Sequence, residues 1–528
     1  MSNRVKSFAD SIKERCTFLD IAVLLQVLFI SFQNLFTIRD VLDNDMAKLF
    51  VHVAEMVKQG DIFIRDWLYE DLELGFSSFF AIFIYAVTRN IYVSFGIASI
   101  IFLIIYLYVI NEFLKLPGFD HDARRFAMLV FMVPYSFGQL MYSHMLFFSA
   151  SYYCIKVIVP LMAFVFLVAE DKDYFKKHKG LLILYFVFLF VTSASTGTYV
   201  FITGLVPLMG VYIFMGCSRS REKTLFLTAS LADTVAGLAF SVLAPVDYAA
   251  YNAELTISNS LHDVCVSLIT CFFEMMGCMP DDPIAVSSLQ GVSCMLRALF
   301  TIIFVLFMIA YSIRGGRAFY FKAGKVRDFM SIYAVVLLFC NLFIVIMTGL
   351  TDNTRYMLIS LCPMMFIFAA ELYEKIYSAQ ERHVQVCMLG VFFVMLLLSD
   401  HNMAFGNPYP YYRSDSAKYD KLQNLLDEEP DKDVVFLNDM GTTEILRARN
   451  IENDRIFLTY ASEGATDFGE GYVVTDYFRS LTEPDSIGDD YLLVVNKDWG
   501  TIDDMPDKIK YNYQELGEYS NFIVYSKE

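Results

Sequence analysis

The sequence lacks the short motifs that define many soluble enzyme classes. Its 528 residues contain no glycine-rich phosphate loop, no zinc-type spacing of cysteine and histidine, and no nucleophile elbow. It also has no internal repeat and no low-complexity linker. Charged residues are scarce, at 19% against 56% hydrophobic residues, and they gather in loops and near the C-terminal end. This composition excludes an ordinary soluble protein and indicates a polytopic membrane protein.

Acidic residues outnumber basic residues, and the formal net charge is −17. Most of this charge comes from the segment that begins near Asp400, which is rich in aspartate and glutamate. An acidic segment of this kind argues against a nucleic-acid partner. Tryptophan is also rare, with 2 residues against 33 tyrosines and 50 phenylalanines, and this usage favours a bacterial source.

Cysteine is present at ten positions, none of them after Cys387. Most of these cysteines lie in apolar runs, where a small polarizable side chain is simply part of the core. Cys265, Cys271, Cys278 and Cys294 differ because they flank a segment that we expect outside the membrane. A disulfide among these four stays open, and the sequence does not choose its pairing.

Basic clusters alternate with nearly uncharged stretches along the chain, beginning with Arg4, Lys6, Lys13 and Arg15. Short basic loops stay on the cytoplasmic side of a membrane, so each cluster predicts a cytoplasmic turn. No small-residue cleavage site follows the first apolar run, which we therefore interpret as a retained span with a cytoplasmic N-terminus.

Eleven spans are predicted, because about 20 apolar residues cross the hydrocarbon. They lie near residues 17–37, 91–113, 126–142, 150–169, 180–195, 198–216, 225–244, 291–313, 329–349, 355–373 and 384–400. An odd number of crossings places the C-terminal part outside the cell membrane. The apolar piece 75–88 is too short to cross and is predicted to be a helix that lies in or dips into the outer leaflet.

Two domains follow from this pattern. Residues 1–400 are predicted to form the transmembrane domain, and its first external loop, 38–90, carries interfacial helices. Residues 401–528 are predicted to form a soluble extracytoplasmic α/β domain. In this second part KYDKLQNLLDEE predicts an amphipathic helix, and DVVFLND, YLLVVN and NFIVYS predict strands. The other segments expected outside are 143–149, 193–198, 245–290 and the loop around Asp352.

The first external loop reads RDVLDNDMAKLFVHVAEMVKQGDIFIRDWLYED and starts directly after the first span. Its motif residues are Asn44-Asp45, Ala54-Glu55-Met56 and Gly60-Asp61. An acid just beyond the first span, a helix that ends in Gly-Asp, and then a half-embedded helix resemble the GT-C superfamily of integral-membrane glycosyltransferases. The loop is most similar to the aminoarabinose transferase and protein mannosyltransferase branch. Met46 stands where the family has a second acid, and the family's Pro-Pro is absent.

This resemblance implies a polytopic α-helical GT-C-like fold and assigns the loop acid to Asp45, with Asp43 as the second choice. The chemistry gives an independent reason for an acid here, because a sugar hydroxyl is a poor nucleophile near neutral pH. A positioned carboxylate that takes its proton supplies roughly 10²–10⁴-fold in rate. The alternative is that Asp45 only caps the following helix, which stabilises the helix by about 1 kcal/mol.

A lipid phosphate needs cations that do not belong to the cytoplasmic clusters. The candidates are Arg355, Arg89, Arg65, Lys156 and Arg297. GT-C proteins often have an Arg-Tyr pair after an external loop, and Arg355-Tyr356 follows TDNT. A guanidinium matches phosphate oxygens in a bidentate way. The alternative is that these side chains extend to lipid headgroups.

Three further features are candidates for the same site. Lys156 lies within the apolar run YYCIKVIVPLMAF, and an ionisable group there is a functional hypothesis by default. His144 lies in the second external turn, where it assists proton transfer, orients the sugar or is an ordinary interfacial residue. Tyrosines at the outer ends of spans either line a sugar-binding cleft or belong to the interfacial aromatic belt. These tyrosines are Tyr142, Tyr152, Tyr153, Tyr199 and Tyr356.

No metal site and no cofactor are predicted. Asp43-Asn44-Asp45 resembles the paired acids of metal-dependent sugar-nucleotide enzymes only superficially, and Asp281-Asp282 fits a turn. The aminoarabinose and mannosyl branches work without metal, whereas the oligosaccharyltransferase branch uses a divalent ion, so that alternative stays open.

The predicted function is therefore a glycosyltransferase of the cell envelope. The donor would be a polyprenyl-phosphate-linked sugar, because nucleotide sugars are cytoplasmic and an external site needs a donor already carried across the membrane. The acceptor would be a glycan, a lipid or a protein, and the reaction would invert the anomeric carbon. Two alternatives are a transporter or flippase of lipid-linked glycans and a non-catalytic membrane scaffold.

Overall fold

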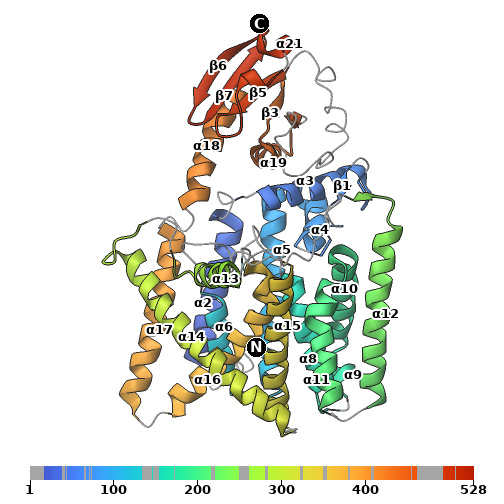
Figure 1. Ribbon diagram of the computed structural model, residues 1–528, viewed down its shortest axis with the longest axis vertical. Coiled ribbons are helices and arrows are strands. Elements are labelled where there is room, and N and C mark those ends of the chain that lie inside the picture. The colour runs from blue at the N-terminus through green and yellow to red at the C-terminus, as the bar shows by residue number, and fades with distance from the viewer. Residues whose placement is uncertain are drawn as a thin grey trace, which may run out of the picture.

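The computed structural model describes most of the chain. The described residues are 17–37, 42, 44–64, 67–69, 72, 74–75, 77–133, 146, 154–171, 173–215, 220–248, 261–279, 283–321, 325–348, 354–378, 381–405, 410–453, 455–460, 491–505 and 507–527. They form a bundle of long helices with a small sheet-containing unit at one end (Figure 1).

The bundle contains the predicted spans. Its elements are α2 (Phe18–Phe32) with η1 (Gln33–Thr37), α5 (Ile91–Lys115), α6 (His121–Phe131), α8 (Cys154–Val168), α9 (Tyr174–Lys177), α10 (Lys179–Thr196), η4 (Phe201–Leu205) with α11 (Val206–Phe214), α12 (Arg221–Leu243), α14 (Leu289–Tyr320), α15 (Val326–Met347), η6 (Thr354–Met357) with α16 (Leu358–Ser378), and α17 (Arg382–Phe405). Seven described helices are long and apolar enough to cross a membrane. Three of the other predicted spans coincide with α8, η4 with α11, and α16, which are shorter or carry more charge. The remaining span, 126–142, overlaps α6 only from residue 126 to residue 131, and its residues 134–142 lie outside the described part of the chain.

Polar residues start several of the long helices. The carboxamide oxygen of Asn90 accepts a hydrogen bond from the Val93 N–H at 3.0 Å at the start of α5. Ser220 and Ser288 cap α12 and α14 in the same way. Such caps satisfy N–H groups that have no partner inside the helix. These capping residues therefore determine where the long helices begin, next to the apolar runs of the sequence.

The helices of segment 38–90, the loop predicted to be external, gather at the end of the bundle nearest the small unit, which we call the proximal end (Figure 1). They are α3 (Asn44–Gln59) and α4 (Ser78–Thr88), and the helix predicted within 75–88 is thereby confirmed. Two-residue strands β1 (Leu68–Tyr69) and β2 (Asp247–Tyr248) pair in parallel there. This pairing joins two of the segments expected outside, and α13 (Leu261–Met275) lies at the same end.

The C-terminal unit is a small α/β fold. Its elements are α18 (Pro410–Leu426), β3 (Asp433–Leu437), α19 (Met440–Arg449), β4 (Phe457–Tyr460), β5 (Tyr491–Asn496), η9 (Ile502–Asp504), α21 (Asp507–Lys510), β6 (Tyr513–Tyr519) and β7 (Phe522–Lys527). The strand order is β4-β3-β5-β7-β6, with β3 parallel to β4 and β5 and with β7 antiparallel to its neighbours. The helix and the three strands predicted in this part are confirmed, whereas β4, β6 and α19 were not predicted.

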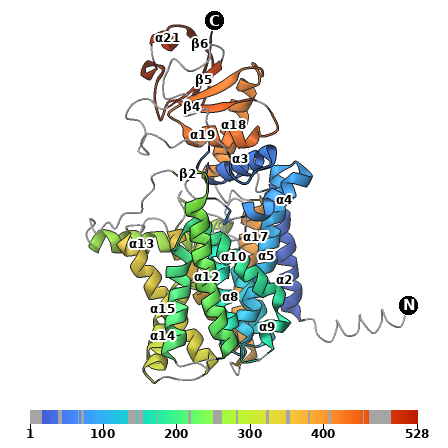
Figure 2. The same ribbon diagram turned by 90° about the vertical axis from the view of Figure 1, so that its right-hand side faces the viewer.

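The C-terminal unit rests on α3 (Figure 2). Ile445 and Ala448 of α19 belong to the same buried core as Phe50 and Val53 of α3. Because α3 packs against α19 above and α4 below, both of its faces are covered. A core shared by the two parts ties the first external loop to the C-terminal unit.

The cysteines near α13 carry free thiols where the structure describes them. Cys265, Cys278 and Cys294 are unpaired by any disulfide, and the thiol of Cys294 lies 2.9 Å from the Cys278 carbonyl oxygen. The side chain of Cys271 lies outside the described residues.

Candidate active site

The predicted base belongs to the first turn of α3. This helix begins at Asn44, so Asp45 is its second residue, and the structure describes the main chain there but not the side chain. The helix then turns a nearly continuous buried surface inward, with Met46, Ala47 and Phe50 at most 1% exposed. The position of the Asp45 main chain is therefore set by the packing of the whole helix.

Aromatic rings pack around His52 of α3. The ring of His52 lies 4.9 Å from that of Trp67 and 5.3 Å from that of Tyr69, measured between centroids. The Tyr69 hydroxyl accepts a hydrogen bond from the Ile64 N–H at 2.8 Å. Burial, with a smaller contribution from Lys48, lowers the pKa of His52 to about 3. His52 is fully buried among these rings, and so weak a base is suited to packing the loop.

A second group of residues fixes the main chain beside Arg355. The carbonyl oxygen of Tyr356 accepts a hydrogen bond of 2.8 Å from the Tyr199 hydroxyl and one of 3.0 Å from the Asn341 amide. Ser360 donates to the amide oxygen of Asn341 at 2.8 Å and so orients that side chain. We call Tyr199, Asn341, Tyr356 and Ser360 the carbonyl clamp. It joins the segment before η4 to α15 and to the start of α16.

Lys156 lies beside this clamp. Its side chain is on α8 and is 6% exposed, and its ammonium nitrogen lies 5.6 Å from the centroid of the Tyr199 ring. A cation over a tyrosine ring is attracted by the ring's quadrupole, more strongly when the pair is away from water. The structure therefore brings Lys156, Tyr199 and Tyr356 together, next to the main chain of Arg355.

The other predicted site residues are distributed differently. Arg89 ends α4 on the surface with a left-handed backbone (φ 54°) and does not belong to the clamp. The side chains of Asp45 and Arg355 are not described. Six further predicted residues lie outside the described part of the chain altogether: Asp43, Arg65, Tyr142, His144, Tyr152 and Tyr153. Their roles stay predictions.

The sequence reasoning missed Asn341 and Ser360. The signal that could have found Asn341 is its carboxamide within the apolar run FCNLFIV, because polar groups inside a span need partners. Arg297, one of the cations predicted from the sequence, belongs to a second buried network. There Gln26 donates to the Met132 carbonyl at 2.9 Å and to Asp400 at 2.8 Å, and the Arg297 guanidinium donates to Ser399 at 2.7 Å.

Metal ligands do not cluster in the described part of the chain. No group of three or more histidine, cysteine, aspartate or glutamate side chains could hold an ion among these residues.

The bundle, the loop helices and the C-terminal α/β unit together form an ArnT-like fold, in agreement with the GT-C-like fold that the loop motif predicted. Two crystal structures of ArnT from Cupriavidus metallidurans are similar to it. The one bound to undecaprenyl phosphate has a TM-score of 0.57 and 12% sequence identity, and the alignment covers 96% of this chain and 97% of ArnT. The apo structure has a TM-score of 0.54, with the same identity and coverage. The sequence matches no protein-family model and no curated protein sequence.

Proposed function

We propose that this protein is a glycosyltransferase that moves a sugar from a polyprenyl-phosphate donor to a glycan, lipid or protein acceptor at the proximal end of the bundle. The observation that carries the proposal is the carbonyl clamp with Lys156 beside it. An anionic lipid phosphate in a membrane protein needs cations that are held in place. Lys156 is a buried cation here, and the clamp fixes the backbone next to Arg355. The likeness to an ArnT structure that holds undecaprenyl phosphate supports the same donor class.

In the proposed reaction Asp45 is the base. Its carboxylate takes the proton from the acceptor hydroxyl as that oxygen forms a bond to the anomeric carbon. The bond between this carbon and the phosphate oxygen breaks on the opposite side, so the configuration inverts. The electron pair leaves with the lipid phosphate, whose negative charge Arg355 and Lys156 stabilise, with Arg65 or Arg89 as further cations.

The proposed orientation follows from the basic clusters of the sequence. The N-terminus would be cytoplasmic, and the proximal end with its C-terminal unit would face outward from the cell membrane. A donor that is already anchored in the bilayer would then enter the site laterally. The C-terminal unit, which covers α3, is suited to help hold the acceptor above the loop.

The experiment compares Asp45→Asn with the native chain. Purified protein is mixed with envelope glycolipids and with undecaprenyl-phosphate-linked glucose, mannose or aminoarabinose, and released undecaprenyl phosphate is measured by mass spectrometry. The variant should lose roughly 10²–10⁴-fold in rate, because the general base is gone. It should still bind undecaprenyl phosphate.

Asp61→Asn is the matched control, because Asp61 is exposed in the same loop and its carboxylate accepts a hydrogen bond from the Phe63 N–H. Full activity of Asp45→Asn would remove Asp45 as the base. The flippase alternative would be favoured if the native chain released undecaprenyl phosphate from none of the donors but moved a lipid-linked glycan across the membrane of vesicles. Excess EDTA should leave the rate unchanged, since the proposed steps use only protein groups.

A further inference from the structure

A groove lies at the other end of the bundle, far from the proposed active site. We call this the distal end; it contains the start of α2 and of α6. The groove has a volume of about 380 Å³ and runs between α2 and α5 over α6. Its walls are mainly apolar, with Val23 and Val27 on α2 and Leu107 on α5. The surrounding face of α2 is apolar and turned outward, since Leu24 is 57% and Leu28 is 57% exposed. The groove therefore opens toward lipid.

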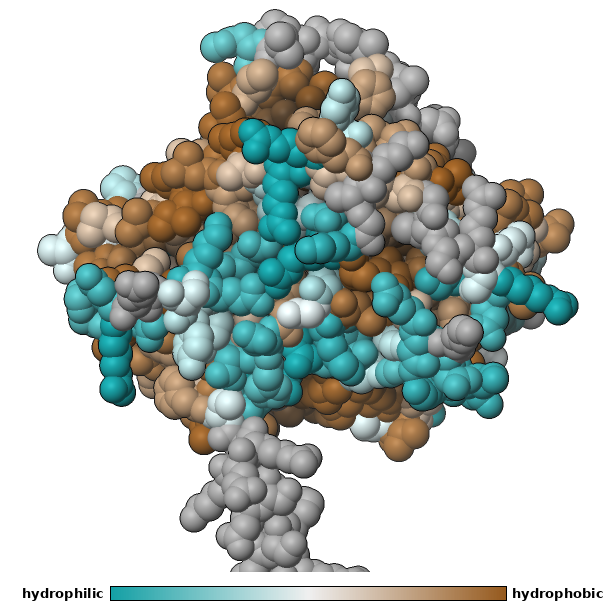
Figure 3. Space-filling model, turned by 90° about the horizontal axis from the view of Figure 1, so that it is seen from below, coloured by the Kyte–Doolittle hydropathy of each residue, from teal (hydrophilic) through white to brown (hydrophobic). Residues whose placement is uncertain are grey.

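The mouth of the groove is polar. Arg125 and Asn111 line it together with Asp20. Viewed from the distal end, hydrophilic residues gather in the middle of the face and hydrophobic residues lie around much of its rim (Figure 3). An apolar channel that ends at such a boundary matches a molecule with an acyl chain and a polar head.

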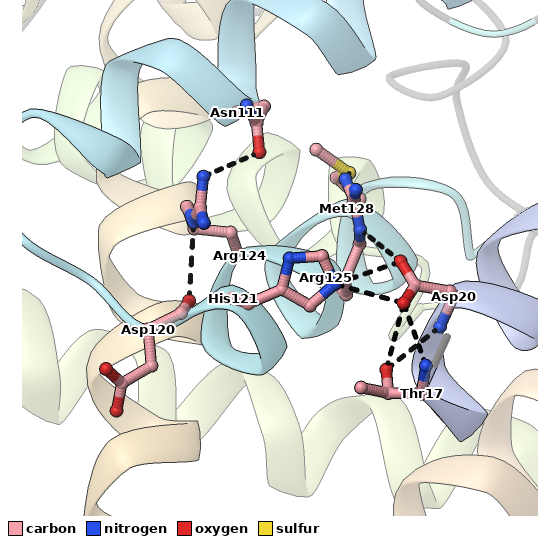
Figure 4. A network of polar contacts seen from close by, with 8 residues as sticks. All are labelled: Thr17, Asp20, Asn111, Asp120, His121, Arg124, Arg125 and Met128. Atoms are coloured by element: carbon pink, nitrogen blue, oxygen red, sulfur yellow. Dashed lines mark hydrogen bonds and ion pairs between the residues drawn. The ribbon is translucent and has the colours of Figure 1, made fainter. Parts of the chain in front are cut away.

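Asp20 does not bar an anion from this mouth, because its carboxylate is already covered. Its oxygens accept hydrogen bonds from the Arg125 Nε at 2.6 Å, from the Thr17 N–H at 3.0 Å and from the Thr17 hydroxyl at 3.2 Å. The Nε2 of His121 lies 3.1 and 3.0 Å from the two oxygens. Figure 4 shows Asp20 enclosed by these partners, with the carboxylate of Asp120 pointing away from them. Asp20 thus orients the guanidinium and is itself neutralised.

Arg125 keeps unused donors. A guanidinium has five N–H groups. Its Nε serves Asp20, and Nη1 contacts the Met128 sulfur at 3.4 Å. No other partner of Arg125 occurs within the described residues, and its side chain is 26% exposed. Arg124 is held separately, because it donates to the Asn111 side-chain oxygen at 2.9 Å. At least three N–H groups of Arg125 are therefore available at the groove mouth.

We infer that this groove binds one glycerophospholipid of the surrounding leaflet. The phosphodiester accepts hydrogen bonds from the free N–H groups of Arg125, and one acyl chain lies along Val23, Val27 and Leu107. Both parts of the ligand are required. The apolar walls make no favourable contact with an inorganic anion, and a neutral lipid gives Arg125 no anionic acceptor for a charge-assisted hydrogen bond. The site is separate from the donor site and supports the distal end of α2 against α5 and α6.

The test measures binding to the delipidated full chain in detergent by native mass spectrometry. The probes are dioleoyl phosphatidylglycerol, dioleoylglycerol with the same chains but no phosphate, and inorganic phosphate. The native chain should retain one phosphatidylglycerol and neither of the others. Arg125→Gln should raise the apparent dissociation constant roughly ten- to a hundredfold, because charge-assisted hydrogen bonds are lost. Val27→Trp should do the same by filling the groove.

Two matched controls separate the groove from general effects. Arg317→Gln removes an exposed arginine from the last turn of α14, and Leu25→Trp adds the same ring to an outward position of α2 that does not line the groove. Both should bind phosphatidylglycerol like the native chain. Equal retention of dioleoylglycerol, displacement by inorganic phosphate, unchanged binding in Val27→Trp, or a change of oligomeric state in Val27→Trp would each overturn the inference. The Val27 variant keeps the test decisive if Arg125→Gln fails to fold.

Discussion

The hydroxyl of Tyr199 donates a 2.8 Å hydrogen bond to the main-chain carbonyl of Tyr356, although 157 positions separate the two residues in the chain. The bond ties the segment before η4 to η6, the short helix that precedes α16. Asn341 of α15 reaches the same oxygen at 3.0 Å. Three parts of the bundle thus meet at one carbonyl, and the residue before it is Arg355. The clamp fixes the backbone from which that guanidinium extends.

Tyr199→Phe keeps the aromatic ring and removes one of the two hydrogen bonds to the Tyr356 carbonyl. We expect a loss of about 1 kcal/mol in the free energy of unfolding, because one hydrogen bond is lost while Asn341 still satisfies the carbonyl. Binding of undecaprenyl phosphate should weaken as well, since Arg355 is less well positioned. Thermal unfolding and equilibrium binding in detergent measure the two effects.

Tyr320→Phe is the control for this change, because Tyr320 is 80% exposed. Combining Tyr199→Phe with Asn341→Ala leaves the carbonyl without either donor. The double variant should then lose more stability than the sum of the single variants. Strict additivity would show that the two bonds do not act on one element.

Lys156→Met should separate stability from binding. A neutral, flexible side chain of similar length keeps the packing and loses the contact with the Tyr199 ring, so the melting temperature should fall only slightly. The affinity for undecaprenyl phosphate should fall at least about tenfold if the ammonium holds the phosphate. Lys176→Met is the control, since that side chain is 72% exposed. Unchanged affinity would mean that Lys156 only extends toward the membrane surface.

The sequence predicts the elements of this protein better than their contacts. Apolar runs and basic turns locate the spans, and alternation predicts β3, β5 and β7, because these patterns depend on nearby residues. The loop motif locates Asp45 and the start of α3 for the same reason. The clamp is different, since Tyr199, Asn341 and Tyr356 converge only after three helices pack. The strand β6 was missed because its residues from Gln514 to Tyr519 are exposed or half-buried and do not alternate cleanly.

Gly237 on α12 marks a close approach between α12 and α10. A Cβ at this position would lie 2.7 Å from the Phe190 carbonyl oxygen and 2.8 Å from the Ser193 Cβ. Gly237→Ala should therefore destabilise the fold by about 1–3 kcal/mol, because backbone atoms cannot give way cheaply. Gly210→Ala is the control, since a Cβ there meets nothing within 4 Å. Thermal unfolding compares them, and equal melting temperatures would contradict the packing of α12 on α10.

His52 should make the stability of the protein depend on pH. Its folded-state pKa is about 3, below the ordinary value of 6.5, because burial disfavours the charged ring. Between these two values the unfolded chain binds more protons than the folded chain, so stability rises with pH and is lost as the pH falls from about 6.5 toward 3. From pH 7 to pH 5 the expected loss is about 2 kcal/mol.

His52→Phe should flatten this dependence, because phenylalanine fits among the rings of Trp67 and Tyr69 and takes up no proton. Melting temperatures of the native chain and the variant at pH 7.5 and pH 5 measure the difference. His262→Phe is the matched control, since His262 is exposed on α13 and its replacement should leave the native pH dependence intact. A native chain that melts at the same temperature at both pH values would show that His52 is accessible to protons in the folded state. The first external loop would then be more open than its packing between α19 and α4 implies.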